Sequence, residues 1–342
     1  MRRAERGRRE HRTRRGDGGP RGRHRHVRHL QAGAADRPRG RALRRHRTGR
    51  HRPRRRPADP DVVAARPTDV QPPEPGPESD KYRRGVVGVL AGGDAFTGAA
   101  VLCTGGAVRG GAGMVRFASV AHPVELVRQR WPEAVTTVLE PGTPGDKALE
   151  QIGRVQAWVV GPGLGTGTAA ESLVAAVLAT ELPVLVDADG LTVLARRRAL
   201  LRRPAPTVLT PHAGELARLL GAERDAVEAR RLEHARRAAD ELGATVLLKG
   251  STTLVAEQDR PVRVNPTGTP RLATAGTGDV LSGLIGALLA GRGDAALDAA
   301  AGGAYLHGLA GRLASAGTDG REAPISPQDV VDALPAAFRT LS

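Results

Sequence analysis

Residues 275–283, Ala275-Gly276-Thr277-Gly278-Asp279-Val280-Leu281-Ser282-Gly283, form the stretch that decides the fold. Glycines precede a helix that the pattern predicts over about residues 279–290. Free backbone N–H groups at a helix N-terminus favour phosphate or a developing anion, and glycine lets a ligand approach the backbone closely. The Asp279 carboxylate would be able to take a proton from a substrate hydroxyl there. The alternative is an ordinary helix N-cap, and this stretch alone does not separate the two.

Upstream of this stretch, short apolar runs alternate with helical patterns. The predicted strands are residues 86–90, 114–117, 157–160, 184–186, 207–209, 245–248, 253–255 and 262–264. The predicted helices between them are 99–108, 168–180, 213–220 and 226–242, and a helical tail follows residue 278. Such alternation predicts an α/β fold with a mainly parallel central sheet and helices on both faces. With 3 Phe, 2 Tyr and 2 Trp, the core has to consist of aliphatic side chains.

The N-terminal 60 residues differ in composition from the rest. They contain 23 arginines, no lysine and five acidic residues, a charge of +18, whereas the whole chain carries +16. The remaining 282 residues therefore carry about −2, so nucleic-acid binding is not expected of the folded part. Residues 1–58 lack apolar periodicity, and 66–78 contain five prolines. We predict that residues 1–78 are a disordered segment and linker, and that the folded domain spans 79–342.

Three explanations compete for the basic segment: a tail that binds nucleic acid or acidic surfaces, a targeting peptide, or a run without an evolved role. The last is favoured, because an arginine-rich, lysine-free run is what out-of-frame or untranslated GC-rich DNA would encode. Cys103 is the single cysteine, so no intramolecular disulfide is expected and a cytoplasmic location is predicted. The chain contains no uninterrupted apolar run of 18 residues, so no membrane span is expected.

Polar groups follow several of the predicted strands, where α/β folds place their ligands. Lys249 stands at a strand end before glycine and hydroxyl residues and would meet a nucleotide phosphate; the alternative is an ordinary charged strand end. The turn at residues 160–167 is glycine-rich but does not match a dinucleotide fingerprint. His212 would hydrogen-bond a ligand or be a structural loop histidine. Asp187 and Asp189 would face a ligand or cap the next helix.

Together these segments resemble the ADP/ATP-dependent NAD(P)H-hydrate dehydratases of the ribokinase-like superfamily. The resemblance covers residues 79–339 and rests on ten short stretches in order. They are Ser79-Asp80-Lys81-Tyr82, Gly98-Ala99-Ala100, Gly111-Ala112-Gly113-Met114-Val115, Gly161-Pro162-Gly163-Leu164-Gly165, Asp187-Ala188-Asp189-Gly190-Leu191, Thr210-Pro211-His212-Ala213-Gly214-Glu215, Lys249-Gly250-Ser251, Asn265-Pro266-Thr267-Gly268, Gly276-Thr277-Gly278-Asp279 and Tyr305-Leu306-His307-Gly308. Two departures are Gly93, where the family usually has serine, and Ala275, where many members have glycine.

The resemblance implies a role for each group of residues. Asp279 would be the catalytic base, and Gly276, Thr277 and Gly278 would form the anion hole. ADP or ATP would be held by Lys249, Gly250, Ser251, Thr252, Thr253 and Gly278. NAD(P)H-hydrate would contact Ala99, Gly163, His212 and Asp279. Mg²⁺ would arrive with the nucleotide, because no metal-binding cluster of protein side chains is visible in the sequence.

The implied reaction restores NAD(P)H from its hydrate with release of phosphate, and it leaves AMP from ADP or ADP from ATP. The family tends to assemble, so a homo-oligomer such as a tetramer is expected, with an NAD(P)H-hydrate epimerase as a functional partner. Many members carry a fused epimerase domain, of which residues 1–78 show no trace. The alternative function is a kinase of the same fold acting on hydroxyethylthiazole or a pyridoxal-like alcohol. A nucleic-acid-associated protein acting through its basic tail is a third hypothesis, weakened by the lack of interleaved aromatic residues.

Overall fold

The computed structural model describes residues 61–70, 76, 78, 80–292, 295–317 and 321–341. Its centre is one sheet with the strand order β1-β10-β9-β8-β7-β6-β5-β2-β3-β4. The strands are β1 (Val62–Ala64), β2 (Val86–Leu90), β3 (Met114–Ser119), β4 (Val135–Val138), β5 (Ala157–Val160), β6 (Val184–Val186), β7 (Thr207–Leu209), β8 (Thr245–Leu248), β9 (Leu254–Ala256) and β10 (Val262–Val264). Only the two pairings of β9, with β8 and with β10, are antiparallel among the described strands. The predicted mainly parallel sheet is confirmed.

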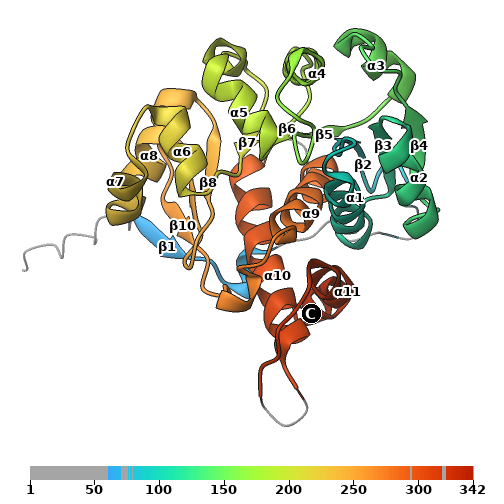
Figure 1. Ribbon diagram of the computed structural model, residues 1–342. Coiled ribbons are helices and arrows are strands. Elements are labelled where there is room, and N and C mark those ends of the chain that lie inside the picture. Colours follow the sequence, from blue (N-terminus) through green and yellow to red (C-terminus); the bar gives the residue numbers. More distant parts are fainter. Residues whose placement is uncertain are drawn as a thin grey trace, which may run out of the picture. The chain divides into compact units, whose positions relative to one another are not determined.

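Helices cover both faces of this sheet (Figure 1). They are α1 (Thr97–Arg109), α2 (Ala121–Arg130), α3 (Gly145–Ile152), α4 (Thr168–Leu178), α5 (Asp189–Arg196), α6 (Ala213–Leu220), α7 (Arg224–Ala229), α8 (Arg231–Leu242), α9 (Thr277–Arg292), α10 (Ala296–Ser315) and α11 (Pro327–Arg339). Alternate residues of β2 belong to two separate hydrophobic clusters: Val87 and Val89 pack with α1, α2 and α9–α11, and Val86 and Leu90 pack with α3–α8. A strand buried on both faces needs the continuous apolar run that β2 has.

Glycines bring the backbones of α1 and α9 unusually close together. A Cβ on Gly283 of α9 would lie 1.9 Å from the carbonyl oxygen of Cys103 in α1. A Cβ on Gly106 of α1 would lie 2.2 Å from the carbonyl oxygen of Val280 in α9. Because neither position tolerates a side chain without movement, this α1–α9 seam fixes the position of α9 and of its N-terminus. Cys103 is fully buried within the seam.

The start of the folded domain differs from the prediction. Val62–Ala64 forms β1, an edge strand that pairs in parallel with β10, and Ala65 and Val70 are buried in the core. Residues 61–70 are therefore part of the domain rather than of a disordered linker, because two apolar side chains and a strand pairing hold them there. The prediction of disorder for residues 1–60 lies outside the described residues.

Further elements differ from the prediction, and α2, α3 and α5 have no counterpart among the helices named from the sequence. The predicted helix 226–242 consists of two helices, α7 and α8, separated at Arg230, whose φ of −134° and ψ of 54° interrupt the helix. The edge strand β4 was not predicted, because it is short and half-exposed, with two threonines at its centre. Within the described part of the chain, no helix is both long and apolar enough to cross a membrane.

Candidate active site

The loop before α9 is held open by its own backbone and by one threonine. Gly276 has a φ of +94°, in the region that favours glycine. The Thr277 hydroxyl donates to the carbonyl oxygens of Leu272 (2.8 Å) and Thr274 (3.0 Å), which anchors the turn. Within the described residues, the backbone N–H groups of Gly276, Thr277 and Gly278 have no protein acceptor. The three predicted anion-hole residues therefore present free donors at the start of a helix.

Asp279 lies in the first turn of α9. Its backbone N–H donates to Gly276 O at 3.1 Å. The helix begins two residues earlier, at Thr277, so the interpretation of Asp279 as an ordinary N-cap does not describe this helix. Asp279 thus belongs to the same helix start as the free N–H groups.

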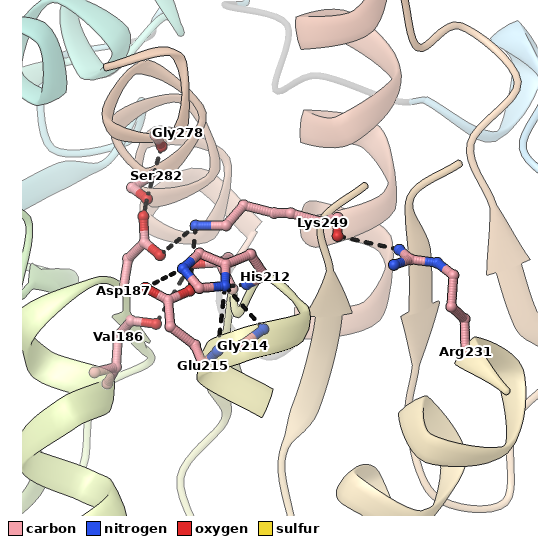
Figure 2. A network of polar contacts seen from close by, with 10 residues as sticks. Val186, Asp187, His212, Gly214, Glu215, Arg231, Lys249, Gly278 and Ser282 are labelled. Atoms are coloured by element: carbon pink, nitrogen blue, oxygen red, sulfur yellow. Dashed lines mark hydrogen bonds and ion pairs between the residues drawn. The ribbon is translucent and has the colours of Figure 1, made fainter. Parts of the chain in front are cut away.

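A polar network connects β6, β8 and α9 beneath this loop (Figure 2). The buried Asp187 carboxylate, at the end of β6, accepts from Lys249 Nζ at 2.7 Å and from Ser282 Oγ at 2.7 Å. Lys249 Nζ also lies 3.9 Å from the Glu215 carboxylate, whose pKa is raised chiefly by burial. Lys249 is therefore held between two acidic side chains, and each Asp187 oxygen is engaged by a donor.

The electrostatics of the network act on Asp279. Burial, and then the nearby charge of Asp187, raises the pKa of the Asp279 carboxyl to about 7, against an opposing effect of Lys249 and a smaller contribution from Asp189. A carboxyl with a pKa near neutrality is suited to general base catalysis at physiological pH, because it releases and accepts protons readily there.

A cavity of about 400 Å³ opens next to the anion-hole loop. Its lining includes predicted nucleotide-binding and anion-hole residues from two segments far apart in the sequence, namely Lys249, Gly250, Ser251, Thr253, Thr277 and Gly278. Leu272 and Leu281 add apolar surface. Thr252, Gly276 and Asp279 are not among the lining residues. The volume and the few polar groups in an apolar wall are typical of small-ligand sites.

His212 is the N-cap of α6 and takes part in a reciprocal capping box. The His212 Nδ1 accepts from the backbone N–H groups of Gly214 (3.0 Å) and Glu215 (3.2 Å). The backbone N–H of His212 donates to the Glu215 carboxylate (2.8 Å). Burial, followed by the charge of Lys249, lowers the pKa of His212. The neutral ring then carries its proton on Nε2, which lies 3.5 Å from Glu215 Oε1. The structure therefore gives His212 the structural role expected as the alternative, with both ring nitrogens near groups of the first turn of α6.

The other predicted substrate contacts lie on the glycine-rich turn after β5. A Cβ on Gly163 would lie 2.8 Å from the Ala99 Cβ, so these two residues are adjacent. The Gly165 N–H donates to Asp189 Oδ2 at 2.8 Å, which ties the turn to the start of α5. Gly161 packs against the Asp187 backbone so tightly that a Cβ would lie 2.1 Å from its carbonyl oxygen. The turn is thereby fixed beside the strand end that supplies the polar network.

Sequence reasoning missed two members of this site. Ser282 lies one turn after Asp279 on the same helix, and that spacing was a usable signal. Arg231, which contacts the loop after β8, had no such signal, because only the fold brings α8 to that loop. His307 was part of a matched stretch without a role; it is buried against the cavity, and burial lowers its pKa to about 4.

The strand order, the two helical layers and the glycine-rich loop at the N-terminus of α9 define a ribokinase-like α/β protein with a cavity beside that loop. Residues 87–335 match the family described as NAD(P)H-hydrate dehydratase. The chain belongs to this family.

Three similar proteins illustrate the family. The bifunctional NAD(P)H-hydrate repair enzyme Nnr of Mycobacterium tuberculosis is 54% identical over 235 residues, which are 67% of this chain and 46% of that protein. The ADP-dependent (S)-NAD(P)H-hydrate dehydratase of Neisseria meningitidis is 40% identical over 240 residues, 68% of this chain and 78% of that protein. A Bacillus subtilis ADP/ATP-dependent NAD(P)H-hydrate dehydratase, crystallised with ATP and Mg²⁺, is 30% identical with a TM-score of 0.68, covering 79% of this chain and 94% of that one. The chain spans about half the length of the bifunctional relative.

Proposed function

We propose that this chain dehydrates hydrated NAD(P)H, using ADP or ATP as the phosphoryl donor. The observation that carries the proposal is the Asp279 carboxyl, with a pKa of about 7, beside the free N–H groups of 276–278 and the cavity that Lys249 lines. A base, an anion site and a nucleotide-sized cavity together suit the phosphorylation of a hydroxyl group. The names of the relatives support the hydrate of NAD(P)H as the molecule that bears this hydroxyl.

In the proposed reaction, Asp279 takes the proton from the hydroxyl at C6 of the hydrated nicotinamide ring. The oxygen attacks the terminal phosphoryl group, whose bond to the bridging oxygen breaks and leaves AMP or ADP. Free N–H groups of Gly276, Thr277 and Gly278 stabilise the charge on the transferred group. The ring nitrogen lone pair then expels phosphate with its oxygen, and loss of a ring proton restores the dihydropyridine.

The loop after β8 is proposed to hold the nucleotide. Lys249 provides a positive charge, and Ser251, Thr252 and Thr253 provide hydroxyl groups. Lys249 is bound to Asp187 in the structure, so phosphate would compete with this carboxylate for the ammonium group. Such competition would favour the more highly charged end of the nucleotide.

Magnesium is proposed to enter with the nucleotide. Among the residues described, no three His, Cys, Asp or Glu side chains gather closely enough to hold a metal ion, and both Asp187 oxygens are already engaged. This donor set fits an ion that keeps most of its waters and is held by phosphate oxygens. When bound, it would neutralise charge on the phosphate groups.

The hydrated dinucleotide is proposed to contact Ala99, Gly163 and His212. Gly163 and Ala99 offer a surface without bulky side chains, and His212 offers Nε2, which lies 3.5 Å from Glu215 Oε1 in the structure. A homo-oligomer, an epimerase as functional partner and a cytoplasmic location stay predictions from the sequence. The bifunctional names of several relatives support the link to an epimerase.

The test is recovery of absorbance at 340 nm, the dihydronicotinamide band, from purified protein, NADH-hydrate, Mg²⁺ and either ADP or ATP. Recovery that depends on the nucleotide is the expected result, and the nucleotide that gives the faster recovery is the preferred donor. A stable phosphate ester in place of orthophosphate would instead indicate a small-molecule kinase. No recovery, with an active dehydratase as control in the same assay, would contradict the proposal.

A further inference from the structure

Arg231, the first residue of α8, contacts the loop after β8 (Figure 2) and is not among the residues that line the cavity. Its Nη2 lies within hydrogen-bond distance of three backbone carbonyl oxygens, those of Leu248 (3.3 Å), Lys249 (3.0 Å) and Thr252 (3.3 Å). Its Nη1 donates to the Glu228 carboxylate at 2.9 Å. The guanidinium is mostly buried, with 19% of the side chain exposed. Arg231 thus binds both ends of the loop and is itself oriented by α7.

These contacts determine which way the loop backbone faces. Three of its carbonyl groups turn toward the guanidinium. In the part of the chain that the structure describes, the backbone N–H groups of residues 250–253 donate to no protein acceptor. Three of these residues, Gly250, Ser251 and Thr253, line the cavity. Successive N–H groups left free by such a turn form a concavity suited to an anion.

Gly250 shows how closely the guanidinium lies against the loop. A Cβ at this position would be 2.4 Å from Arg231 Nη2, well inside any permitted contact. A side chain at position 250 would therefore displace the guanidinium, which is the far end of a long side chain. Lysine in place of Arg231 would keep the charge, but a single ammonium group lacks the planar fork that reaches several acceptors while pairing with Glu228.

We infer that Arg231 is a positioning residue for the nucleotide: it shapes the Lys249–Thr253 loop and so sets the affinity for ADP or ATP without touching the reacting atoms. This inference rests on the proposed function only in taking the cavity as the nucleotide site. Arg231 acts through the loop, so its loss should weaken binding of the nucleotide much more than turnover at saturating nucleotide.

The first experiment is calorimetric titration of the full chain with Mg²⁺ and ADP or ATP, which needs no hydrate. We expect Arg231→Ala to raise Kd about tenfold or more, as for the loss of hydrogen bonds from a charged group, and Arg231→Lys to fall between it and wild type. Arg230→Ala is the matched control: Arg230 is the exposed neighbour with a long ion pair to Glu233 (3.8 Å), and its Kd should equal that of wild type.

Two readouts separate positioning from general destabilisation. Free guanidinium at a non-denaturing concentration should restore part of the affinity of Arg231→Ala and leave wild type unchanged. In steady-state kinetics KM for the nucleotide should rise while kcat and KM for NAD(P)H-hydrate change little. Gly250→Ala, which displaces the guanidinium without removing it, should weaken nucleotide binding in the same direction.

The results that would overturn this inference differ from those that would overturn the proposed function. A wild-type chain that binds neither ADP nor ATP would contradict the assignment of the cavity and this inference with it. Wild type that binds nucleotide, alongside an Arg231→Ala variant with equal Kd, overturns the inference alone. If Arg231→Ala fails to fold, as judged by its melting curve, Arg231→Lys decides: a folded lysine variant with wild-type Kd also overturns it.

Discussion

The carboxyl of Asp279 occupies a site where its charged form is disfavoured in the free protein. It is largely buried and shares its surroundings with Asp187, and Lys249 compensates only in part because it is bound directly to Asp187. Such a group is a stronger base than an exposed aspartate, at the cost of some folding free energy. Two measurements follow at the scale of this residue.

The first is the pH dependence of turnover. Asp279 must be ionised to accept a proton, and its pKa lies at about 7. We expect kcat/KM to fall about tenfold for each pH unit below the pKa and to level off above it. The Asp279→Asn variant should retain only residual activity with no such limb. A wild-type profile that stays flat below neutrality would contradict Asp279 as the base.

The second is the stability of Asp279→Asn. Because the pKa of Asp279 is higher in the folded than in the unfolded chain, ionisation opposes folding, and its cost grows as the pH rises from 3.8, the ordinary pKa of the side chain, to about 7. Asparagine removes this cost. We expect the variant to melt at a higher temperature than wild type above neutral pH, with the difference shrinking toward pH 4. A variant that is less stable at alkaline pH would contradict the shifted pKa.

At the scale of elements, most of the sheet could be predicted, because its inner strands are continuous apolar runs between glycine-rich turns. The break between α7 and α8 could not, since residues 224–242 contain no glycine or proline to mark it, and the turn at Arg230 is seen only in the structure. The predicted anion-hole and nucleotide segments do meet at one cavity. The Asp187–Lys249–Ser282 network could not be predicted, because it forms only where β6, β8 and α9 come together in the fold.

The α1–α9 seam supplies a prediction of its own. Gly283→Ala places a methyl group against the Cys103 carbonyl oxygen and should cost about 1–3 kcal/mol by overpacking. It should also reduce activity, because α9 positions Asp279. Gly302→Ala in α10 is the control, since its Cβ would meet only Val70 at 3.4 Å. That variant should be as stable as wild type or slightly more so. Thermal melting of both tests this; equal behaviour of the two would argue against the tight seam.

At the scale of the whole molecule, one edge strand of the sheet lies directly after the part of the sequence that carries most of the charge. β1 pairs with the outer edge of β10, and Ala65 and Val70, which follow it, are buried in the core. The charge of the chain is concentrated before this strand, in residues 1–60. Removing residues before β1 should therefore change the charge of the chain, and removing β1 and Val70 as well should change its stability.

We expect a chain that lacks residues 1–60 to keep the activity and melting temperature of the full protein and to lose most of its positive charge. A chain that lacks residues 1–70 should be less stable by about 2 kcal/mol or more, because Val70 alone is a buried aliphatic side chain. Parallel melting curves, with salt-dependent binding to nucleic acid as a second readout, test this. A loss of activity on removing only 1–60 would show that the basic segment contributes to function.

The buried thiol in the seam gives the molecule an internal reporter. Cys103 is the single cysteine, it is fully enclosed, and burial keeps its pKa well above that of a free thiol. A thiol-labelling reagent can react only when α1 separates from α9, so the rate of labelling under native conditions measures how often that pair of helices opens. Nucleotide or substrate bound at the N-terminus of α9 should slow the labelling. The labelling rate would then rank ligands by how strongly they suppress the separation of α1 from α9, without an assay of the enzymatic reaction.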